Sequence, residues 1–245
     1  MPIDDVFTRL TEVLLEWTGG NEIPLYILAA LVVGYIMGCS RPFRSLRAFR
    51  ASPASPYQNR GEALLTHELR KNFGSPDYHL MNHVTLEMDD GTTQIDHILV
   101  SRFGVFVIET KDHKGWIFAD PRQAKWTQVL YHLKFKFQNP IFQNNRHVRA
   151  VQDCLDFLPP DAIESVVVFT GEAEFKTEVP QGVYWGISAL MDHLRRQDIE
   201  VMSLNRMQFC VGRLETARLA LSRETDVEHV RSLERRHGRV GYPAH

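Results

Sequence analysis

The segment TQIDHILVSRFGVFVIETKDHKG, residues 93–115, places Asp96, Glu109 and Lys111 inside runs that otherwise read as buried strand. Two carboxylates that face each other on a sheet repel, and they do so more strongly where water is excluded. A divalent cation between them makes the arrangement sensible, because Mg²⁺ takes oxygen ligands, prefers one or two carboxylates plus water, and leaves positions for phosphate. A nearby lysine can orient an attacking water or share the charge on phosphate oxygens. These residue types indicate metal-assisted phosphodiester hydrolysis.

A hairpin that turns at residues 102–103 fixes which of these side chains meet. Because side chains alternate along a strand, its register puts Asp96 opposite Glu109 and Gln94 opposite Lys111, all on one face. The structural alternative is a solvent-facing salt bridge between Lys111 and one of the acids, which the apolar character of both strand faces disfavours. Gln94 either contacts a metal-bound water or the substrate, or makes an ordinary structural hydrogen bond.

The segment IPLYILAALVVGYIMGCS, residues 23–40, contains no charged residue. At a rise of about 1.5 Å per residue it spans roughly 27 Å, enough to cross a hydrocarbon core. Four arginines follow in RPFRSLRAFR, whereas acids predominate before the segment, so the positive-inside rule puts the N-terminus outside and the rest of the chain in the cytoplasm. The sequence predicts a single-pass anchor in an inner or cytoplasmic membrane, with the lipid bilayer as a partner.

Other interpretations of residues 23–40 compete with the anchor. A cleaved signal peptide needs a basic region before the apolar run, and the approach here is acidic. The lipoprotein-like string IMGCS around Cys39 lacks the same basic region. A buried core helix is disfavoured by the polar flanks and by the linker-like ASPASPYQNR, residues 51–60.

Composition sets the domain plan. A chain of 245 residues with 44% hydrophobic residues can bury a sizeable core, and its length suits one main domain plus attachments. The formal net charge of -2 argues against a generally polybasic nucleic-acid binder, and 3 cysteines without a CxxC pair favour a reducing compartment. We expect an extracytoplasmic segment over 1–21, a transmembrane helix over 22–40, a basic juxtamembrane linker over 41–59, a nuclease-like domain over 60–187 and a helical extension over 188–245.

The part after the linker alternates helical and strand patterns. Apolar spacing predicts a helix in GEALLTHELRKNF, a strand in YHLMNHVTLEM, then the hairpin, a helix in NPIFQNNRHVRAVQDCLDFLPP, a strand in IESVVVFTG, and helices around 188–197 and 203–221. This order predicts an α/β domain.

Several pieces of the chain match one family pattern in order: GE at 61–62, QIDH from Gln94, ETKDHKG from Glu109, Trp126, and NPIFQN from Asn139. Over roughly residues 60–158 the chain resembles the PD-(D/E)XK nuclease superfamily and, more narrowly, the nuclease-related domain family, NERD, on the strength of the ordered set. The resemblance implies a restriction-endonuclease-like fold, with a mixed central sheet flanked by helices. It also implies that Asp96 and Glu109 are ligands of Mg²⁺, with Mn²⁺ as the other ion, that Lys111 is the catalytic lysine, and that Glu62 is a further acid at the site.

The chain departs from the family pattern after the lysine. The family often has asparagine where this chain has Asp112, whose added charge either tightens metal binding or repels phosphate. Gln143 resembles the family's helix-borne glutamine, with helix capping by Asn139 as the structural alternative. His97 points away from Asp96, so we expect it either to pack in the core or to support the site residues from behind.

The run LYHLKFKFQNP alternates apolar residues with His132, Lys134 and Lys136. An amphipathic strand of this kind can follow a phosphate backbone with its basic face, or its lysines can protect an exposed sheet edge. Arg146 on the following helix either extends the same basic surface or is solvated.

With the resemblance, these features predict a membrane-anchored, magnesium-dependent nuclease that acts in the cytoplasm on nucleic acid, DNA in the first place. The alternative is a catalytically silent nucleic-acid-binding or scaffolding domain tethered to the membrane, and a third interpretation is a different metal-dependent phosphoesterase. No pattern separates DNA from RNA, endonuclease from exonuclease, or one sequence preference from another. Oligomeric state and pathway are not predicted.

Overall fold

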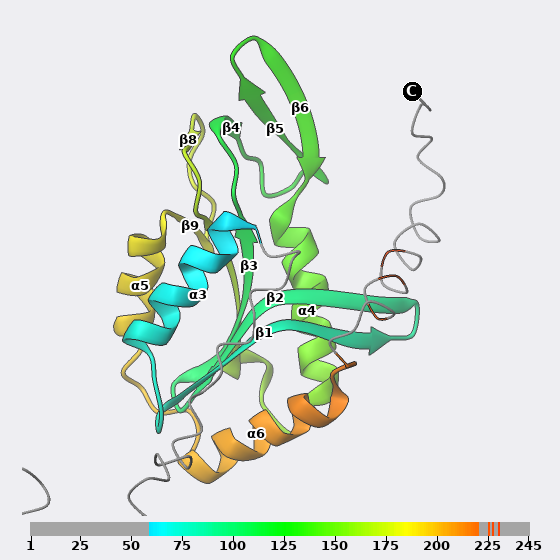
Figure 1. Ribbon diagram of the computed structural model, residues 1–245, viewed down its shortest axis with the longest axis vertical. Helices are drawn as coiled ribbons and strands as arrows, with labels where there is room; N and C mark the ends of the chain where they lie inside the picture. The colour runs from blue at the N-terminus through cyan, green and yellow to red at the C-terminus, as the bar shows by residue number, and fades with distance from the viewer. Residues whose placement is uncertain (1–58, 221–224, 226, 228–229, 231–245) are drawn as a thin grey trace, which may run out of the picture. The chain divides into compact units, whose positions relative to one another are not determined.

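The computed structural model describes residues 59–220 together with residues 225, 227 and 230. The predicted membrane anchor, 23–40, lies outside the described residues. Within the described part of the chain, no helix is both long and apolar enough to cross a membrane. The described residues form an α/β fold with a mixed sheet and helices on both of its faces (Figure 1), in agreement with the order of patterns in the sequence.

Five strands form the central sheet in the order β1-β2-β3-β7-β9. The first three strands pair with one another in antiparallel fashion, whereas β7 and β9 run parallel to β3. The inner strands read as nearly continuous apolar runs because both faces of the sheet are covered. The strands are β1 (Tyr78–Met88), β2 (Gly91–Ser101), β3 (Gly104–Lys111), β7 (Ile163–Phe169) and β9 (Val183–Trp185).

The hairpin of β2 and β3 has the predicted register. Ser101 pairs with Gly104, and the pairing continues as far as His97 and Ile108. Beyond that point the two main chains no longer pair, and Asp96, the next residue of β2, uses its side chain instead. The predicted turn therefore aligns the two strands up to the position where the charged residues begin.

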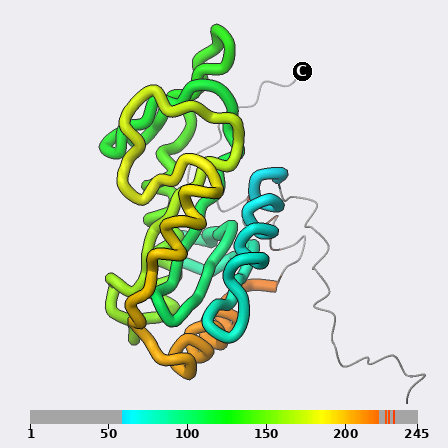
Figure 2. Tube along the Cα trace, turned by 90° about the vertical axis from the view of Figure 1, so that its left-hand side faces the viewer, coloured from blue at the N-terminus to red at the C-terminus, as the bar shows by residue number. Residues whose placement is uncertain are grey.

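Two helices cover each face of the central sheet. On one face lie α3 (Arg60–Asn72) and α5 (Ile187–Arg195), which are neighbours in Figure 2. On the other lie α4 (Pro140–Cys154) and α6 (Leu204–Ala217). Leu65 and Leu69 of α3 are fully buried against the sheet, and burial of a leucine side chain contributes about 1.5–3 kcal/mol. The sheet is thus held between two apolar layers.

The ends of α4 follow from its local sequence. Asn139 caps it, because the Asn139 side chain accepts a hydrogen bond from the Ile141 N–H at 2.9 Å, and Pro140 occupies the first turn. The helix ends at Cys154, earlier than the apolar spacing predicts, since Leu155 leaves helical geometry with φ -117° and ψ 43°. Leu155 still packs in the core from the following turn.

A second sheet, which the sequence did not reveal, has the strand order β6-β5-β4-β8. Gly115 begins it with φ +77°, and a Cβ at this position would lie 2.4 Å from the Val129 carbonyl oxygen, so only glycine fits. Trp126 attaches the sheet to β7, because its buried ring stacks on Phe169 and its Nε1 donates to the Asp120 carbonyl at 2.8 Å. The strands are β4 (Gly115–Phe118), β5 (Lys125–Leu130), β6 (Leu133–Gln138) and β8 (Ala173–Phe175).

The run LYHLKFKFQNP is part of a hairpin and not one strand. β5 ends at Leu130, Tyr131 and His132 form the turn, and β6 begins at Leu133. The prediction of a strand from Tyr131 is therefore wrong at its start: Tyr131 has φ +56°, and the turn lacks the Gly or Asn that usually marks such a position. The hairpin projects from the fold, and β6 is an edge strand (Figure 1).

Candidate active site

Five charged or polar candidates converge near the end of β3. Glu109 and Lys111 are on β3 itself, Asp96 comes from β2, Glu62 from the first turn of α3, and Gln143 from the first turn of α4. Glu109 is 2% exposed. Residues from three separate parts of the sequence therefore meet at one partly buried place.

Lys111 is held by two neighbours. Its Nζ donates to Glu109 Oε1 at 2.5 Å and to Gln143 Oε1 at 3.0 Å. The Lys111 side chain is 18% exposed and that of Glu109 is 3% exposed, so their ion pair is largely buried and is not a solvent-facing salt bridge. Gln143 reaches the site and Asn139 caps the helix, so both interpretations of NPIFQN hold together.

Asp96 bonds with the neighbouring strand through its side chain. Its Oδ2 accepts a hydrogen bond from the Thr110 N–H at 2.7 Å. Removal from water raises the pKa of Asp96 well above its ordinary range, and the charges of Glu109 and Glu62 raise it further. The Thr110 N–H and Lys111 oppose this shift only in part. Asp96 therefore tends to hold a proton unless a cation lies nearby.

Glu109 has a partner for each oxygen. Burial raises its pKa, but Lys111 and His147 lower it more, so the pKa is below its usual value and the carboxylate is ionised. His147 Nε2 lies 3.1 Å from Glu109 Oε2, and its Nδ1 lies 2.7 Å from Thr93 Oγ1. His147 was not among the predicted site residues. The available signal was its position four residues after Gln143, which places both on one helix face.

Glu62 has two roles at once. The Asn59 side chain accepts a hydrogen bond from the Glu62 N–H at 2.9 Å and donates to Glu62 Oε1, which caps α3. Burial raises the pKa of Glu62 to about 7, the charge of Glu109 adds to this, and Lys111 partly opposes it. His83 Nδ1 lies 3.9 Å from Glu62 Oε2. Glu62 is therefore both a partner of the Asn59 helix cap and an acid whose ionised form the charge of Glu109 disfavours.

Gly61 allows α3 to come this close to the sheet. A Cβ there would lie 2.0 Å from Thr170 Oγ1 and 2.9 Å from the Asp112 Cβ. The exposed side chain of Asp112 thus lies beside the first turn of α3, where a negative charge favours the helix dipole. The pair GE combines a close contact at Gly61 with an acid at Glu62.

These residues lie in a part of the chain that matches a family model. Residues 57–170 match the model of the nuclease-related domain. Over 93 residues the chain is 42% identical to an uncharacterized protein of Bacillus anthracis, and the match covers 38% of this chain and 43% of that protein. No solved structure matches the chain. The candidate residues Glu62, Asp96, Glu109, Lys111 and Gln143 all fall within the matched nuclease-related domain.

His97 lies on the opposite face of the sheet from Asp96, as expected. It is fully buried, with Nε2 2.8 Å from Thr66 Oγ1 and Nδ1 3.4 Å from Thr110 Oγ1. Burial lowers the pKa of His97 to about 3. His97 is therefore a neutral packing residue with hydrogen bonds on both ring nitrogens.

Two predicted substrate-binding residues have other neighbours. Gln94 of β2 pairs with Thr85 of β1. The sequence placed Gln94 opposite Lys111, but the pairing of β2 with β3 ends at His97 and Ile108, before either residue is reached. Arg146 forms a two-pronged ion pair with Asp90 in the β1–β2 turn, at 2.8 Å and 2.5 Å. Neither residue has a contact with the acid and lysine cluster among the hydrogen bonds of the described residues.

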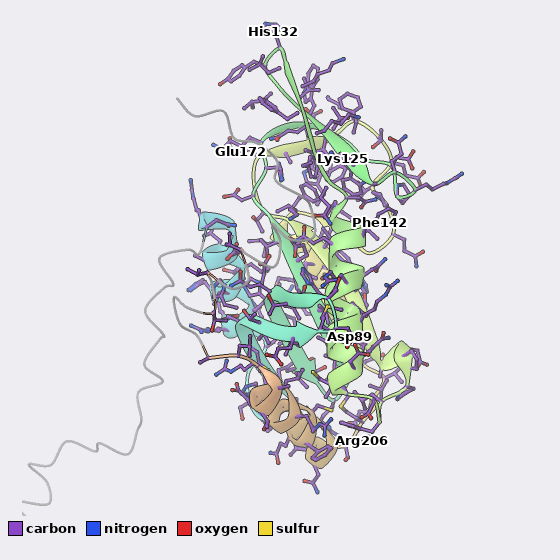
Figure 3. The ribbon with its side chains drawn as sticks, turned by 90° about the vertical axis from the view of Figure 1, so that its right-hand side faces the viewer. Asp89, Lys125, His132, Phe142, Glu172 and Arg206 are labelled. Atoms are coloured by element: carbon purple, nitrogen blue, oxygen red, sulfur yellow. The ribbon has the colours of Figure 1, made fainter. Side chains whose placement is uncertain are left out.

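Two further predicted substrate-binding residues, Lys134 and Lys136, are exposed on β6 at the edge of the second sheet. In Figure 3, His132 marks the tip of their hairpin and Lys125 its base. The chain leads from this hairpin directly into α4 and Gln143. The lysines thus lie one element away from the site in sequence without contacting it.

Asn144 fixes α4 against the sheet and was also missed by the sequence. It is fully buried, and its Nδ2 donates to the carbonyl oxygens of Val107 at 2.9 Å and Val166 at 3.0 Å. These bonds join the helix to β3 and β7 at once. Gln143 and His147, on either side of Asn144, consequently reach Lys111 and Glu109.

The carboxylates suit a divalent cation in kind. Asp96, Glu109 and Glu62 act on one another's pKa and offer only oxygen atoms, the donors that Mg²⁺ and Mn²⁺ prefer. Among the residues that the structure describes, no three His, Cys, Asp or Glu side chains form a metal centre by themselves. Two carboxylates supplemented by water are enough for Mg²⁺, so the residues present fit such an ion.

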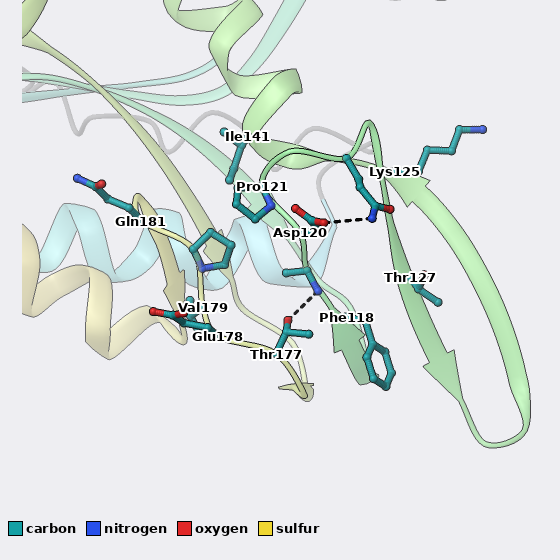
Figure 4. Close-up of a pocket in the computed structure, with 13 residues that line it drawn as sticks. Phe118, Asp120, Pro121, Lys125, Thr127, Ile141, Thr177, Glu178, Val179 and Gln181 are labelled. Atoms are coloured by element: carbon teal, nitrogen blue, oxygen red, sulfur yellow. Dashed lines mark hydrogen bonds between the residues drawn. The ribbon is translucent and has the colours of Figure 1, made fainter.

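A groove of about 850 Å³ lies elsewhere, between the β4–β5 loop and the β8–β9 loop (Figure 4). In that view the loop with Thr177, Glu178 and Val179 faces Pro121 and Ile141. The groove contains none of the acids or the lysine of the candidate site. The chemistry is therefore expected at the end of β3 and not in this groove.

Proposed function

We propose that the nuclease-related domain hydrolyses phosphodiester bonds of nucleic acid, DNA in the first place, with the help of a divalent metal ion. The observation that carries the proposal is Lys111, whose ammonium lies between Glu109 and Gln143 in a cluster with Asp96. The match to the nuclease-related domain supports it. The same residues suit the core arrangement of the PD-(D/E)XK superfamily, with the acids on adjacent strands and the lysine two residues further on.

Asp96 and Glu109 would hold a Mg²⁺ or Mn²⁺ ion, with Glu62 next to them. The ion, when bound, supplies Lewis-acid polarisation of the phosphate and acidifies a water molecule. Its charge would also relieve the repulsion that raises the pKa of Asp96. The acids would then stay ionised together at neutral pH.

The side chains of the domain provide the rest of the reaction. A water oxygen bonds to phosphorus while the bond from phosphorus to a sugar oxygen breaks, and negative charge builds on the phosphate oxygens. Lys111 supplies a fixed positive charge for those oxygens. Glu62, with a pKa of about 7, is suited to take up the proton that the water loses. His147 and Thr93 hold Glu109 in place throughout.

The cellular arrangement is part of the same proposal. Residues 23–40 would anchor the chain, and the arginines after them would keep the nuclease-related domain on the cytoplasmic side. Protease treatment of sealed and opened membrane vesicles would test it. In sealed right-side-out vesicles, whose interior is the cytoplasmic side, the domain should resist the protease, and it should be cut once the vesicles are opened. Recovery of the chain without membranes contradicts the proposal.

Cleavage of labelled single- and double-stranded DNA and RNA by the full chain tests the activity. The reactions contain Mg²⁺, Mn²⁺ or a chelator, and the variants are Glu109→Gln, Asp96→Asn and, as a matched control, Lys114→Gln. Lys114 is an exposed lysine whose partner, Glu172, lies outside the cluster. We expect metal-dependent cleavage that Lys114→Gln keeps and both acid variants lose. Equal cleavage by all variants, or cleavage in chelator, contradicts the mechanism.

A second candidate is a domain that binds nucleic acid without cutting it. The observation in its favour is that Lys111 and His147 already engage both oxygens of Glu109. Such a network needs no ion to be satisfied. Tight binding without cleavage under any metal condition, unchanged by Glu109→Gln, would establish this function in place of hydrolysis.

A further inference from the structure

The outer face of the second sheet carries a repeated pattern across three strands. Directly opposed residues of antiparallel strands share a face, so the pairing of β4 with β5 and of β5 with β6 defines rows of side chains. Each row begins with an aromatic residue, passes through a small neutral one and ends with a lysine. The rows are Trp116, Val129 and Lys134, and Phe118, Thr127 and Lys136.

The aromatic residues of these rows face solvent. Trp116 is 48% exposed and Phe118 is 40% exposed. Their neighbours on the inner face, Ile117 and Trp126, are buried in the core. Two large rings on one strand, each partly exposed, are a surface suited to a ligand.

Three lysines give this face an unbalanced positive charge. Lys134 and Lys136 end the rows, and Lys125 shares their face because it lies two residues before Thr127 on β5. All three are exposed, and within the described part of the chain none forms an ion pair. The whole chain has a formal net charge of -2, so the concentration of unpaired lysines here is local.

A fourth lysine is already neutralised. Lys176, next to β8, lies over the Trp116 ring at 4.8 Å from its centroid and pairs with Glu174. Lys125, Lys134 and Lys136 therefore remain as the cations for a ligand.

Each row offers one flat ring and one cation, and a nucleotide presents one base and one phosphate. Base stacking on an aromatic side chain needs an unpaired base, because the faces of paired bases in a duplex are covered by their neighbours. From this correspondence, we propose that the outer face of the second sheet binds single-stranded nucleic acid. Trp116 and Phe118 stack on two bases, and Lys125, Lys134 and Lys136 contact phosphates.

The face lies close in sequence to the candidate active site. β3 ends at Lys111 and β4 begins at Gly115, so the five residue-to-residue steps from Lys111 to Trp116 span at most about 18 Å. At about 3.4 Å per nucleotide of a stacked strand, roughly five nucleotides bridge that distance. One strand can thus contact both places. The choice of nucleic acid as ligand rests on the proposed nuclease function, whereas the exposed face is independent of cleavage.

A lipid surface also attracts aromatic residues and lysines. The second sheet fits it less well, because Thr127 and the acidic Glu174 lie among the rings and lysines. The rows also separate the rings on β4 from the lysines on β6, which matches a strand with its bases on one side and its phosphates on the other, and not a uniform interface. Lipid binding is accordingly an outcome that the experiment separates.

Fluorescence anisotropy of a labelled oligothymidylate of sixteen nucleotides tests the proposal, with the full chain in chelator to prevent cleavage. The variants are Trp116→Ala with Phe118→Ala, the ring-keeping Trp116→Phe, and Lys134→Gln with Lys136→Gln. Phe209→Ala is the control, since Phe209 is a 56% exposed ring on α6. Stacking contributes about 1–3 kcal/mol per base, so the double aromatic variant should bind at least 10-fold more weakly. The lysine variant should lower the slope of log affinity against log salt by about 0.7 per lysine.

Several results would overturn the proposal. They are unchanged binding by the double aromatic variant, an equal loss in Phe209→Ala, or tighter binding to the same oligothymidylate in a duplex with oligoadenylate. Loss of binding to vesicles of phosphatidylcholine and phosphatidylserine in the aromatic variant, with DNA binding intact, would assign the face to lipid.

The experiment also separates this proposal from the nuclease function. Suppose that Glu109→Gln binds the oligonucleotide like the natural chain and that neither protein cuts it with Mg²⁺. The binding role of the outer face is then supported and the nuclease function is contradicted. Suppose instead that the aromatic variant binds normally and that Glu109→Gln abolishes cutting. The nuclease function is then supported and the binding role of the outer face is contradicted.

Discussion

Charged residues of the central sheet and of the second sheet have contrasting surroundings. At the end of β3, Glu109 is 2% exposed and its two oxygens have partners in Lys111 and His147. On β6, Lys134 and Lys136 are exposed and form no ion pair with other described residues. A buried charge needs fixed partners because its removal from water costs several kcal/mol, whereas an exposed lysine keeps its hydration. The central sheet can therefore hold reacting groups in a fixed geometry, and the second sheet can adapt to a flexible ligand.

The two faces of the second sheet differ just as much. Trp126 packs inward on Phe169 with 1% of its surface exposed, whereas Trp116, ten residues earlier, is 48% exposed. The same residue type thus stabilises the fold at one position and is available for contact at the other. Substitutions of these two tryptophans give the first and largest test of the contrast.

Trp126→Ala should lower the free energy of unfolding by roughly 3–5 kcal/mol, because it leaves a cavity between the second sheet and β7. Trp116→Ala should change it by about 0.5 kcal/mol or less, as is usual at the surface. Urea unfolding followed by circular dichroism measures both. Similar losses in the two variants would show that Trp116 also supports the fold.

Lys111→Gln should lower the rate of cleavage by roughly 10²–10³-fold. The substitution removes the fixed positive charge that stabilises the negative charge developing on the phosphate oxygens. The substitution also leaves Glu109 with His147 as its remaining partner. Single-turnover cleavage with Mg²⁺ is the measurement, and Lys114→Gln is the control. A rate within a few-fold of the natural chain would remove Lys111 from the mechanism.

His147→Ala should lower kcat by about 10–100-fold with little change in KM, as is typical when a residue that orients a metal-binding carboxylate is removed. Thr93→Val should have a smaller effect in the same direction, since it removes the hydroxyl that contacts His147 Nδ1. Steady-state kinetics and an unfolding curve for each variant separate positioning from stability. A rise in KM alone, or a loss of activity that follows a loss of fold, would contradict a positioning role.

His97 should make the domain sensitive to acid. Its pKa in the folded state is about 3, below the ordinary value of 6.5, so the unfolded chain binds the proton more readily. The stability that neutral His97 contributes is complete above pH 6.5 and is lost as the pH falls towards 3, at about 1.4 kcal/mol per pH unit.

The measurement for His97 is urea unfolding between pH 7 and 4 in chelator, as the difference between the natural chain and His97→Gln. The free energy of unfolding of His97→Gln should depend less on pH than that of the natural chain. The control His132→Gln, at the exposed hairpin turn, should have the same pH dependence as the natural chain. Equal slopes in all three chains would show that His97 carries its charge in the folded state.

The sequence was sufficient for the part of the fold that positions the acids. A single turn at residues 102–103 fixes the hairpin register. Because side chains alternate between the two faces of a sheet, His97 then points to the face opposite from that of Asp96. The strand limits of β1 and the start of α3 also follow from local patterns. These features depend on neighbours in the chain, which is why one sequence reveals them.

The second sheet could not be predicted in the same way. β4 has only four residues, and its outward residues, Trp116 and Phe118, are as apolar as the inward Ile117, so no alternation is visible. The turn at Tyr131 and His132 carries no glycine or asparagine to mark it. Tertiary contacts, and not local propensity, create these strands.

The helix-borne part of the site was predicted in part. Gln143 was found through the family resemblance, but the sequence analysis did not single out Asn144 or His147. Both are buried because their hydrogen-bond partners lie on the sheet, in residues distant in sequence. The spacing of four from Gln143 to His147 was visible, but nothing local showed that this face of the helix turns inward.

Gly61 sets a condition for anyone who would build this arrangement into another scaffold. Copying Glu62, Asp96, Glu109 and Lys111 transfers the charges, but the position before the first acid has no room for even a methyl group. An alanine there would push the start of the helix outward and carry Glu62 away with it. A transplanted site therefore requires a fifth element, an empty space at the helix start, which a comparison of charged residues alone does not detect.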